Sequence, residues 1–232
     1  MTRILLLNSG PHSEVSHGYR LATEAIAALG ITNVQITERD LVESPIPPID
    51  RAYAIAVTSQ ATPDAKEFEW SERLIVELEQ HDMLFIVTPM HNFTVPAALK
   101  LWIDHVIRIN RSFHSTPQGK VGLLKDRATF VLVSSGGFHV GERAKQTDFL
   151  TPYLRYALAS IGINDVHFFP LQGLVFGTEA VAQAVHEARQ QLAEKLAEKL
   201  AEKLAEKLAE KLTEKLSLTI ACRPATTIIA TS

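Results

Sequence analysis

Residues 87–104 read VTPMHNFTVPAALKLWID, and this stretch decides the fold. The apolar run MLFIV at residues 83–87 leads into it. A short continuous apolar run bounded by breakers is typical of a strand that is buried on both faces. Pro96 suits the first turn of a helix, where its missing N–H costs nothing. The stretch therefore predicts a strand, a tight loop and a helix, and the loop after such a strand is where open parallel sheets bind ligands.

The loop between this strand and this helix carries side chains of four different kinds. They are a thioether, an imidazole, an amide and an aromatic ring, supplied by Met90, His91, Asn92 and Phe93. This mixture suits a flat heteroaromatic ligand better than a phosphate group alone, because such ligands need apolar walls with a few placed polar groups. We therefore expect the loop to lie along a flavin.

Apolar runs and helical periods alternate along the rest of the chain. Further strands are expected at residues 4–7, 34–36, 129–133 and 166–169. Helices are expected at residues 19–29, 65–80, 96–109, 148–161 and 179–191. Thr62 or Asp64 is expected to cap the second of these helices, and residues 51–58 are ambiguous by pattern. The alternation predicts a three-layer α/β fold with a five-stranded parallel sheet in the flavodoxin-like order 2-1-3-4-5.

Length and composition limit the class of protein. The chain has 232 residues, 46% of them hydrophobic, which is enough for one domain with a sizeable core. Its net charge of −3 gives no reason to expect a nucleic-acid partner, and its one cysteine excludes an internal disulfide. The apolar run at the N-terminus is too short for a signal peptide, and no run approaches a membrane span. We expect a cytoplasmic protein without a membrane partner.

Residues 192–215 form a repeat, LAEKLAEKLAEKLAEKLAEKLTEK, made of strong helix formers. Four residues turn a helix by ~400°, so each leucine lies ~40° beyond the last and no straight seam forms. Two interpretations stay open: a helix that extends into solvent, or an oligomerising helix. The expected organisation is a flavodoxin-like domain at residues 1–191, a helical extension at 192–216 and a disordered tail at 217–232.

Two further loops follow strands that neighbour the central strand in this order. Residues 8–18 (NSGPHSEVSHG) offer hydroxyls, imidazoles and glycines just before a helix N-terminus, which is a ready phosphate site. This loop has no Lys or Arg, so hydroxyl and backbone donors would have to hold a phosphate. Residues 134–139 (SSGGFH) contain adjacent glycines that let the backbone approach a ring closely. An ordinary capped loop and a simple turn remain the alternatives at the two positions.

Other chemistries find little support in the sequence. The nine histidines show no metal-ligand spacing, so we expect no metal site, and His105 is interpreted as a core residue. No G-x-S-x-G segment indicates a serine hydrolase. The polar stretch at residues 110–125 is a long excursion for a compact domain, and such excursions are usually functional.

Four segments in order resemble the FMN-dependent NADH-azoreductases, which are flavodoxin-like quinone and azo-dye reductases. The resemblance spans about residues 1–191. The segments are PMHNFTVPAALKLWIDHVIR (89–108), the region of Phe113 and Gln118-Gly119, SSGGFH (134–139) and TPYLRYALASIGI (151–163). The resemblance implies bound FMN, NADH or NADPH as the electron donor, and a quinone or azo compound as the acceptor. It also implies a ping-pong cycle in a homodimer in which each FMN site is completed by the other subunit.

The resemblance also implies the site residues. The FMN phosphate and ribityl chain are placed at Ser9, Gly10, Ser16, His17 and Gly18. The isoalloxazine is placed along Met90, His91, Asn92 and Phe93, with its other edge at Ser134, Ser135, Gly136 and Gly137. The backbone N–H groups of Gly136 and Gly137, with the Asn92 amide, are expected to stabilise the negative charge of the reduced flavin. The substrate face is placed near Phe113, Phe168 and His139, and His139 is the candidate to donate a proton or hydrogen bond to the acceptor.

The chain departs from the family pattern at four positions. His91 replaces a usual Tyr, Gly18 a usual Ser and Ser135 a usual Arg, while Ser115 stands where an aromatic is common. The sequence gives reasons against two other functions. A flavodoxin-type electron carrier is opposed by the absence of a T-x-T-G-x-T loop, and an acyl-carrier-protein phosphodiesterase-like hydrolase by the absence of a nucleophile or metal motif.

Overall fold

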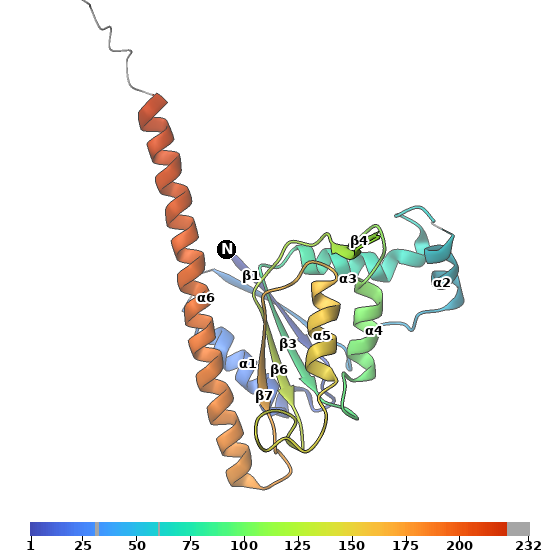
Figure 1. Ribbon diagram of the computed structural model, residues 1–232, viewed down its shortest axis with the longest axis vertical. Coiled ribbons are helices and arrows are strands. Elements are labelled where there is room, and N and C mark those ends of the chain that lie inside the picture. Colours follow the sequence, from blue (N-terminus) through green and yellow to red (C-terminus); the bar gives the residue numbers. More distant parts are fainter. Residues whose placement is uncertain (31–32, 60, 222–232) are drawn as a thin grey trace, which may run out of the picture. The chain divides into compact units, whose positions relative to one another are not determined.

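The computed structural model describes residues 1–30, 33–59 and 61–221, with residues 214–221 as backbone only. A five-stranded parallel sheet lies at the centre, in the order β2-β1-β3-β6-β7 (Figure 1). Its strands are β1 (Thr2–Asn8), β2 (Val34–Asp40), β3 (Met83–Pro89), β6 (Thr129–Ser134) and β7 (Val166–Leu171). Counted within the sheet this is 2-1-3-4-5, so the predicted flavodoxin-like fold is confirmed.

Helices connect the strands. They are α1 (His17–Ala27), α2 (Arg51–Thr58), α3 (Glu69–Glu79), α4 (Ala97–Val106), α5 (Leu150–Ala159) and α6 (Thr178–Ala221), with short 3-10 turns η1 (Ser13–Val15) and η2 (Lys66–Phe68). The polar excursion contains an antiparallel hairpin, β4 (Phe113–Thr116) with β5 (Gly119–Gly122). The hairpin lies at the edge where the sheet strands begin, because α4 runs back along β3 to that edge (Figure 1).

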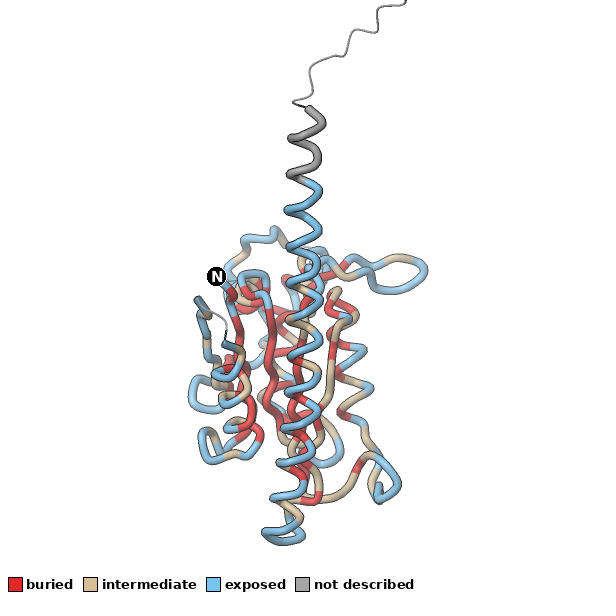
Figure 2. The backbone as a smooth tube through the Cα atoms, turned by 90° about the vertical axis from the view of Figure 1, so that its left-hand side faces the viewer, coloured by how far each residue is buried: buried red, intermediate tan, exposed pale blue. Residues whose placement is uncertain are grey.

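The three central strands, β1, β3 and β6, are almost entirely buried, whereas the edge strand β2 is not (Figure 2). Helices on the two faces of the sheet make the fold three layers deep. On one face, alternate residues such as Leu84, Ile86 and Val131 pack into a core with α3, α4 and α5. On the other face, Phe85 stacks on Phe130 with ring centroids 4.9 Å apart. The period-2 alternation of strand side chains explains why these continuous apolar runs supply both cores.

The central strand β3 is longer than the sequence predicted, because it continues through Thr88 to Pro89. Proline lacks an N–H and is normally excluded from central strands. Here its nitrogen faces the side of β1, since the Val87 carbonyl two residues earlier accepts the Ser9 N–H at 2.9 Å. β1 has already ended at Asn8, so no ladder bond is lost at Pro89.

Two local predictions need correction. Neither Thr62 nor Asp64 caps α3, because η2 precedes that helix and Phe68 stands at its N-cap without a side-chain bond. The Thr62 carbonyl instead accepts the Ala65 N–H in a turn, at 3.0 Å. The helix after Pro96 ends at Val106, three residues early, since the next residue leaves helical geometry. The ambiguous residues 51–58 are helical, and Asp50 caps them by accepting the Tyr53 N–H.

The last helix, α6, contains the LAEK repeat. The chain divides into two compact units, residues 1–192 and 193–232. Within the first, Arg189 of α6 pairs with Glu24 of α1 at 2.6 Å. Within the second, Lys–Glu pairs three residues apart link Lys195 to Glu198 and Lys199 to Glu202. Residues 222–232, with Cys222 and most of the expected tail, lie outside the described residues.

The leucines of α6 differ in burial. Leu192 is fully buried, whereas Leu204, Leu208 and Leu212 are 60%, 53% and 61% exposed. None of the helices in the described ranges carries an apolar stretch long enough to cross a membrane.

Two matched substitutions in this one helix test whether the repeat contributes to folding. Leu192→Ala should lower the free energy of unfolding by about 2–5 kcal/mol, because it leaves a cavity in the core. Leu208→Ala should change it by no more than about 0.5 kcal/mol. Urea unfolding followed by circular dichroism measures both. A loss for Leu208→Ala that grows with protein concentration would instead identify the repeat as an oligomerising helix.

Candidate functional site

The three predicted loops meet at the carboxyl edge of the sheet. The Ser9 N–H donates to the Val87 carbonyl at 2.9 Å, which joins the loop after β1 to β3. The Met90 N–H donates to the Ser134 carbonyl at 2.8 Å, which joins the loops after β3 and β6. The Gln146 amide lies 3.6 Å from the Met90 sulfur. These contacts join segments that lie far apart in the sequence along one edge of the sheet.

A fourth loop, residues 172–177 after β7, belongs to the same edge and was missed from the sequence. Its N–H groups bind the loop after β6: Gly173 donates to Gly137, Leu174 to Ser135 and Val175 to Gly136, at 3.1–3.4 Å. A signal was present, because the segment QGLVFG follows the fifth strand and holds two glycines. In the order 2-1-3-4-5 that strand neighbours the fourth, so its loop had to lie beside residues 134–139.

The loop after β3 is a tight turn. The N–H and carbonyl groups of His91 and Thr94 bond each other at 3.0 and 3.1 Å. Asn92 and Phe93 between them have φ angles of 46° and 75°, as in a type I′ turn. Asn tolerates this conformation, but it is strained for Phe, and such strain concentrates at functional sites. The Phe149 N–H holds the turn by donating to the Phe93 carbonyl at 3.1 Å.

The polar groups of this turn are available to a ligand. The side chains of His91, Asn92 and Phe93 are exposed. No other group in the described part of the chain bonds the Asn92 amide. The turn therefore exposes an amide, an imidazole and an aromatic ring on three consecutive residues.

The first turn of α1 lies at the ends of β3 and β6. Ser16 caps this helix, since its hydroxyl oxygen accepts the Tyr19 N–H at 3.2 Å. The N–H groups of His17 and Gly18 have no acceptor among the described residues, as expected for a helix start. A Cβ at Gly18 would lie 3.2 Å from both Ser134 Oγ and Val87 Cγ1. Gly18, one of the departures from the family pattern, therefore lets the start of α1 lie close to β3 and β6.

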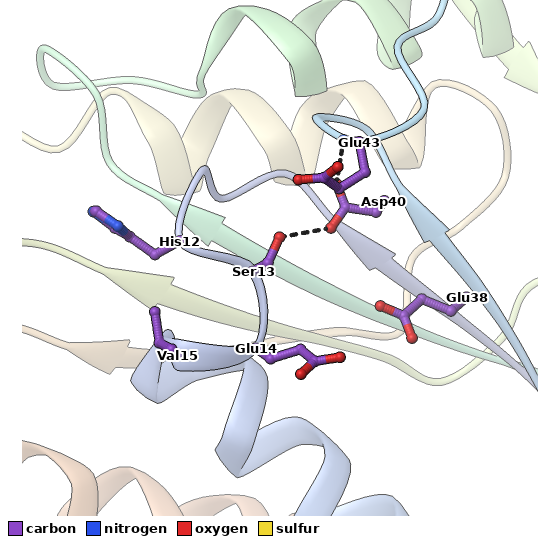
Figure 3. Close-up of a pocket in the computed structure, with 7 residues that line it drawn as sticks. All are labelled: His12, Ser13, Glu14, Val15, Glu38, Asp40 and Glu43. Atoms are coloured by element: carbon purple, nitrogen blue, oxygen red, sulfur yellow. Dashed lines mark hydrogen bonds between the residues drawn. The ribbon is translucent and has the colours of Figure 1, made fainter.

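A second side of the loop after β1 is acidic. A pocket there is lined by His12, Ser13, Glu14, Val15, Glu38, Asp40 and Glu43 (Figure 3). Glu38 accepts a hydrogen bond from Tyr19, and burial together with this carboxylate raises the pKa of Tyr19 to about 12. A pocket with four carboxylates repels a phosphate. A phosphate at this loop would therefore be accepted at the start of α1 and not in the pocket.

Asp40 anchors the loop from within this pocket. One of its oxygens accepts from Asn8 Nδ2 at 2.8 Å and from Ser13 Oγ at 3.2 Å. The other accepts from the N–H groups of Val42 and Glu43 at 2.8 and 2.9 Å. Partial burial would raise the pKa of Asp40, but these hydrogen bonds outweigh it and lower the pKa.

The loop after β6 is partly buried. Ser135 and His139 are 4% and 5% exposed, and their side chains face each other at 2.9 Å. Burial lowers the pKa of His139, with Asp148 opposing the shift. Neither the Gly136 N–H nor the Gly137 N–H has a hydrogen-bond acceptor in the described part of the chain. Both are free to receive a polar ligand edge.

One chain does not bring the predicted substrate residues to these loops. Phe113 lies in β4 at the opposite edge of the sheet, 5% exposed beneath Lys120 (Figure 1). Phe168 lies in the middle of β7, paired with Val131, and packs against the core with Arg155 over its ring. If either residue lines a substrate site at the loops, that site must belong to a second copy of the chain.

The site suits a planar ligand with polar edges and a phosphate. Free N–H groups are present at the start of α1 and at Gly136 and Gly137, and the strained turn adds an amide and an aromatic ring. The described residues contain no group of three His, Cys, Asp or Glu side chains that could hold a metal. The fold and this site define a flavodoxin-like protein.

Comparisons with known proteins agree. The sequence model of a family described as having a flavodoxin-like fold matches residues 2–196. FMN-dependent NADH:quinone oxidoreductase 4 of Pseudomonas fluorescens is 57% identical over 183 residues, which are 78% of this chain and 89% of that protein. FMN-dependent NADH:quinone oxidoreductase 5 of Burkholderia lata is 47% identical, over 75% of this chain and 86% of that protein.

A solved structure shows the same fold. The FMN-dependent NADH-azoreductase of Bacillus anthracis in complex with FMN superposes with a TM-score of 0.73 at 23% identity, over 85% of this chain and 99% of that one. The chain belongs to the family of the FMN-dependent NADH:quinone oxidoreductases, within the flavodoxin-like proteins. The family predicted from the sequence is confirmed.

The anchoring role of Asp40 can be tested by its pH dependence. Asp40→Asn replaces one carboxylate oxygen, which accepts two hydrogen bonds, by an NH2 group that can only donate. It should therefore lower the free energy of unfolding by about 1–3 kcal/mol at pH 7. Because the folded pKa of Asp40 is depressed, the wild-type advantage is present above the unfolded pKa of about 4 and is lost as pH falls through the folded value. Urea unfolding between pH 7 and pH 3 measures this.

The control for this experiment is Glu43→Gln, which alters an exposed carboxylate of the same pocket. It should change the unfolding free energy by less than about 0.5 kcal/mol at any pH. A wild-type advantage over Asp40→Asn that stays constant as the pH falls from 7 to 3 would contradict the anchoring role.

Proposed function

We propose that this chain is an FMN-dependent NAD(P)H oxidoreductase that reduces quinones and azo compounds. Relatives up to 57% identical carry the name FMN-dependent NADH:quinone oxidoreductase. The observation that carries the proposal is the pair of backbone N–H groups at Gly136 and Gly137, for which the described residues provide no hydrogen-bond acceptor. They lie at the carboxyl edge of the sheet, beside the strained turn of Asn92 and Phe93.

The proposed FMN site uses all three predicted loops. The start of α1 offers the N–H groups of His17 and Gly18 and the hydroxyl of Ser16 to the phosphate. Ser9 and Gly10 would hold the ribityl chain. The turn after β3 and the loop after β6 would hold the isoalloxazine, through Met90, His91, Asn92, Phe93, Ser134, Ser135, Gly136 and Gly137.

When bound, FMN would supply hydride transfer between NADH or NADPH and the acceptor, in a ping-pong cycle in which the two substrates use the site in turn. The protein supplies orientation and polar contacts. The glycine N–H groups and the Asn92 amide would hold the part of the cofactor that gains negative charge on reduction, and preorganised donors need no rearrangement at that moment.

His139 is not used as a proton donor in this proposal. Its ring is buried and its pKa is lowered, so it is neutral near pH 7. A direct contact with the acceptor would need the loop after β6 to open. The sequence-based prediction that His139 donates to the acceptor stays a prediction.

The proposal includes a cytoplasmic homodimer with FMN at the interface. Its support is the exposed apolar surface beside the site, where Phe149, Val175 and Phe176 are 57%, 73% and 62% exposed. Apolar patches of this kind mark contact surfaces. The distant position of Phe113 within one chain also agrees with a site completed from a second copy.

The function is tested on the purified full chain. We expect the absorbance of bound flavin, and oxidation of NADH by menadione and by an azo dye. A colourless protein that FMN cannot reconstitute would contradict the proposal. Bound flavin without NADH oxidation would indicate an electron carrier instead.

His91 offers a test of acceptor choice. His91→Tyr restores the residue usual in the family on an exposed turn position, so FMN should stay bound with its dissociation constant within about threefold. The ratio of kcat/KM for menadione to that for an azo dye should change, because the aromatic surface beside the ring changes. Loss of flavin from the variant would contradict the placement of this turn along the isoalloxazine.

The interface location of FMN predicts that dimerisation and FMN binding are linked. Dilution of the holoprotein should release FMN over the same concentration range in which dimers dissociate, because each event stabilises the other. Analytical ultracentrifugation with flavin absorbance follows both species. Monomers that sediment with full FMN content would place the site within one chain.

A further inference from the structure

The loop after β6 turns around a buried pair of side chains, Ser135 and His139, whose hydrogen bonds stay within the loop. The Ser135 hydroxyl oxygen lies 2.7 Å from the Gly137 carbonyl oxygen and 2.9 Å from His139 Nδ1. Both side chains are more than nine-tenths buried. Ser135 also stands where the sequence resemblance implies an arginine, so this pair depends on this chain's own residues.

The position of the protons in this pair follows from its partners. A carbonyl oxygen can only accept, so the Ser135 hydroxyl must donate to Gly137. Its oxygen is then left to accept, and His139 Nδ1 must carry the hydrogen that it accepts. Burial, which lowers the pKa of His139, keeps this imidazole neutral. The bonds run in one direction, from His139 through Ser135 to the Gly137 carbonyl.

The loop is fixed at its other end by Gln172. The side-chain oxygen of Gln172 accepts the N–H groups of His139 and Val140 at 3.0 and 3.1 Å, and its amide nitrogen donates to the Val140 carbonyl at 3.3 Å. The Ser135 N–H donates to the Leu171 carbonyl at 2.8 Å. Both ends of the loop are thus tied to β7 and the residues directly after it.

Peptide geometry then sets the direction of the free N–H groups. In a trans peptide the carbonyl and the next N–H point in opposite directions. The carbonyls of Ser135 and Gly136 accept from Leu174 and Val175, so they point toward residues 172–177. The N–H groups of Gly136 and Gly137 therefore point away from that loop. β6 separates β7 from β3, so the opposite side is the side of the turn after β3.

We propose that Ser135, His139 and Gln172 are positioning residues that hold the Gly136 and Gly137 N–H groups as a fixed donor pair, and that this pair binds reduced FMN more tightly than oxidised FMN. This rests on the proposed FMN function. Reduction adds negative charge to the ring, and hydrogen bonds to a charged acceptor are stronger than bonds to a neutral one. A pair held in place by buried bonds makes these contacts without reorganisation.

The experiment compares three variants with wild type: Ser135→Ala, His139→Ala and His139→Asn. The dissociation constants of oxidised FMN and of dithionite-reduced FMN are measured anaerobically on the full chain, with the thermal midpoint of the FMN-free protein. Ser135→Ala removes one oxygen atom and leaves the Gly173 N–H on the Gly137 carbonyl. His139→Asn keeps an N–H donor near the position of Nδ1.

We expect Ser135→Ala and His139→Ala to weaken binding of reduced FMN about tenfold more than binding of oxidised FMN, the size of one lost charge-assisted hydrogen bond. His139→Asn should restore the ratio of the two constants to within about twofold of wild type. In wild type, the amide proton resonances of Gly136 and Gly137 should shift when FMN is added. In His139→Ala these shifts should be smaller.

The matched control is His81→Ala. His81 is also a buried histidine with a hydroxyl partner, since its ring nitrogens lie 2.8 Å from Thr37 Oγ1 and 2.6 Å from the Glu77 carbonyl. It precedes β3 at the other edge of the sheet. His81→Ala should lower the thermal midpoint and leave the ratio of the two FMN constants unchanged.

Two results would overturn the inference. One is a lower thermal midpoint in Ser135→Ala and His139→Ala with an unchanged ratio, which would show a purely structural pair. The other is a ratio in His139→Asn as low as in His139→Ala, since the donor at Nδ1 would then not matter. Failure of the proposed function looks different, because wild type would then bind FMN in neither redox state.

Discussion

The structure depends on the register of β3 between β1 and β6. Once Val87 accepts the Ser9 N–H and Ser134 accepts the Met90 N–H, the loops on both sides are bound to the central strand. Pro89 can end this strand because its missing N–H faces the side where β1 has already stopped. These bonds therefore fix the residues at which the strands end, and with them the positions of the loops that follow.

The polar character of the site comes from the backbone more than from side chains. No Lys or Arg lies in residues 8–18, and Ser135 stands where the family uses an arginine. The site instead offers the N–H groups at the start of α1 and those of two peptide groups in the loop after β6. The carbonyls of these two peptide groups already accept hydrogen bonds from the loop after β7. Because peptide groups are planar, using a carbonyl on one side presents an N–H on the other. The loop after β7 contributes to the site in this way without reaching a ligand itself.

Much of this could be predicted from the sequence, and the reasons are local. The apolar run 83–87 with Pro96 fixed the central strand and its helix, and the alternation of elements fixed the strand order. The cap of α3 was predicted wrongly because the Thr62 carbonyl accepts a hydrogen bond within a turn. Such a turn competes with helix capping but has the same residue types in the sequence. The buried state of His139 depends on Ser135 and Gln172, and the contact with Gln172 spans more than thirty positions. The hydrophobic periodicity of the sequence does not reveal a contact between residues so far apart.

Two of the four departures from the family pattern, Gly18 and Ser135, have a common physical consequence. Each is a small residue in a close contact that involves the end of β6 or the loop after it. A bulkier group at Gly18 would press on Ser134, whose carbonyl holds the turn of His91 and Asn92 through Met90. The helix start, the turn and the glycine pair are thus adjusted to one another. A substitution at one of them is transmitted to the others through the backbone of β6.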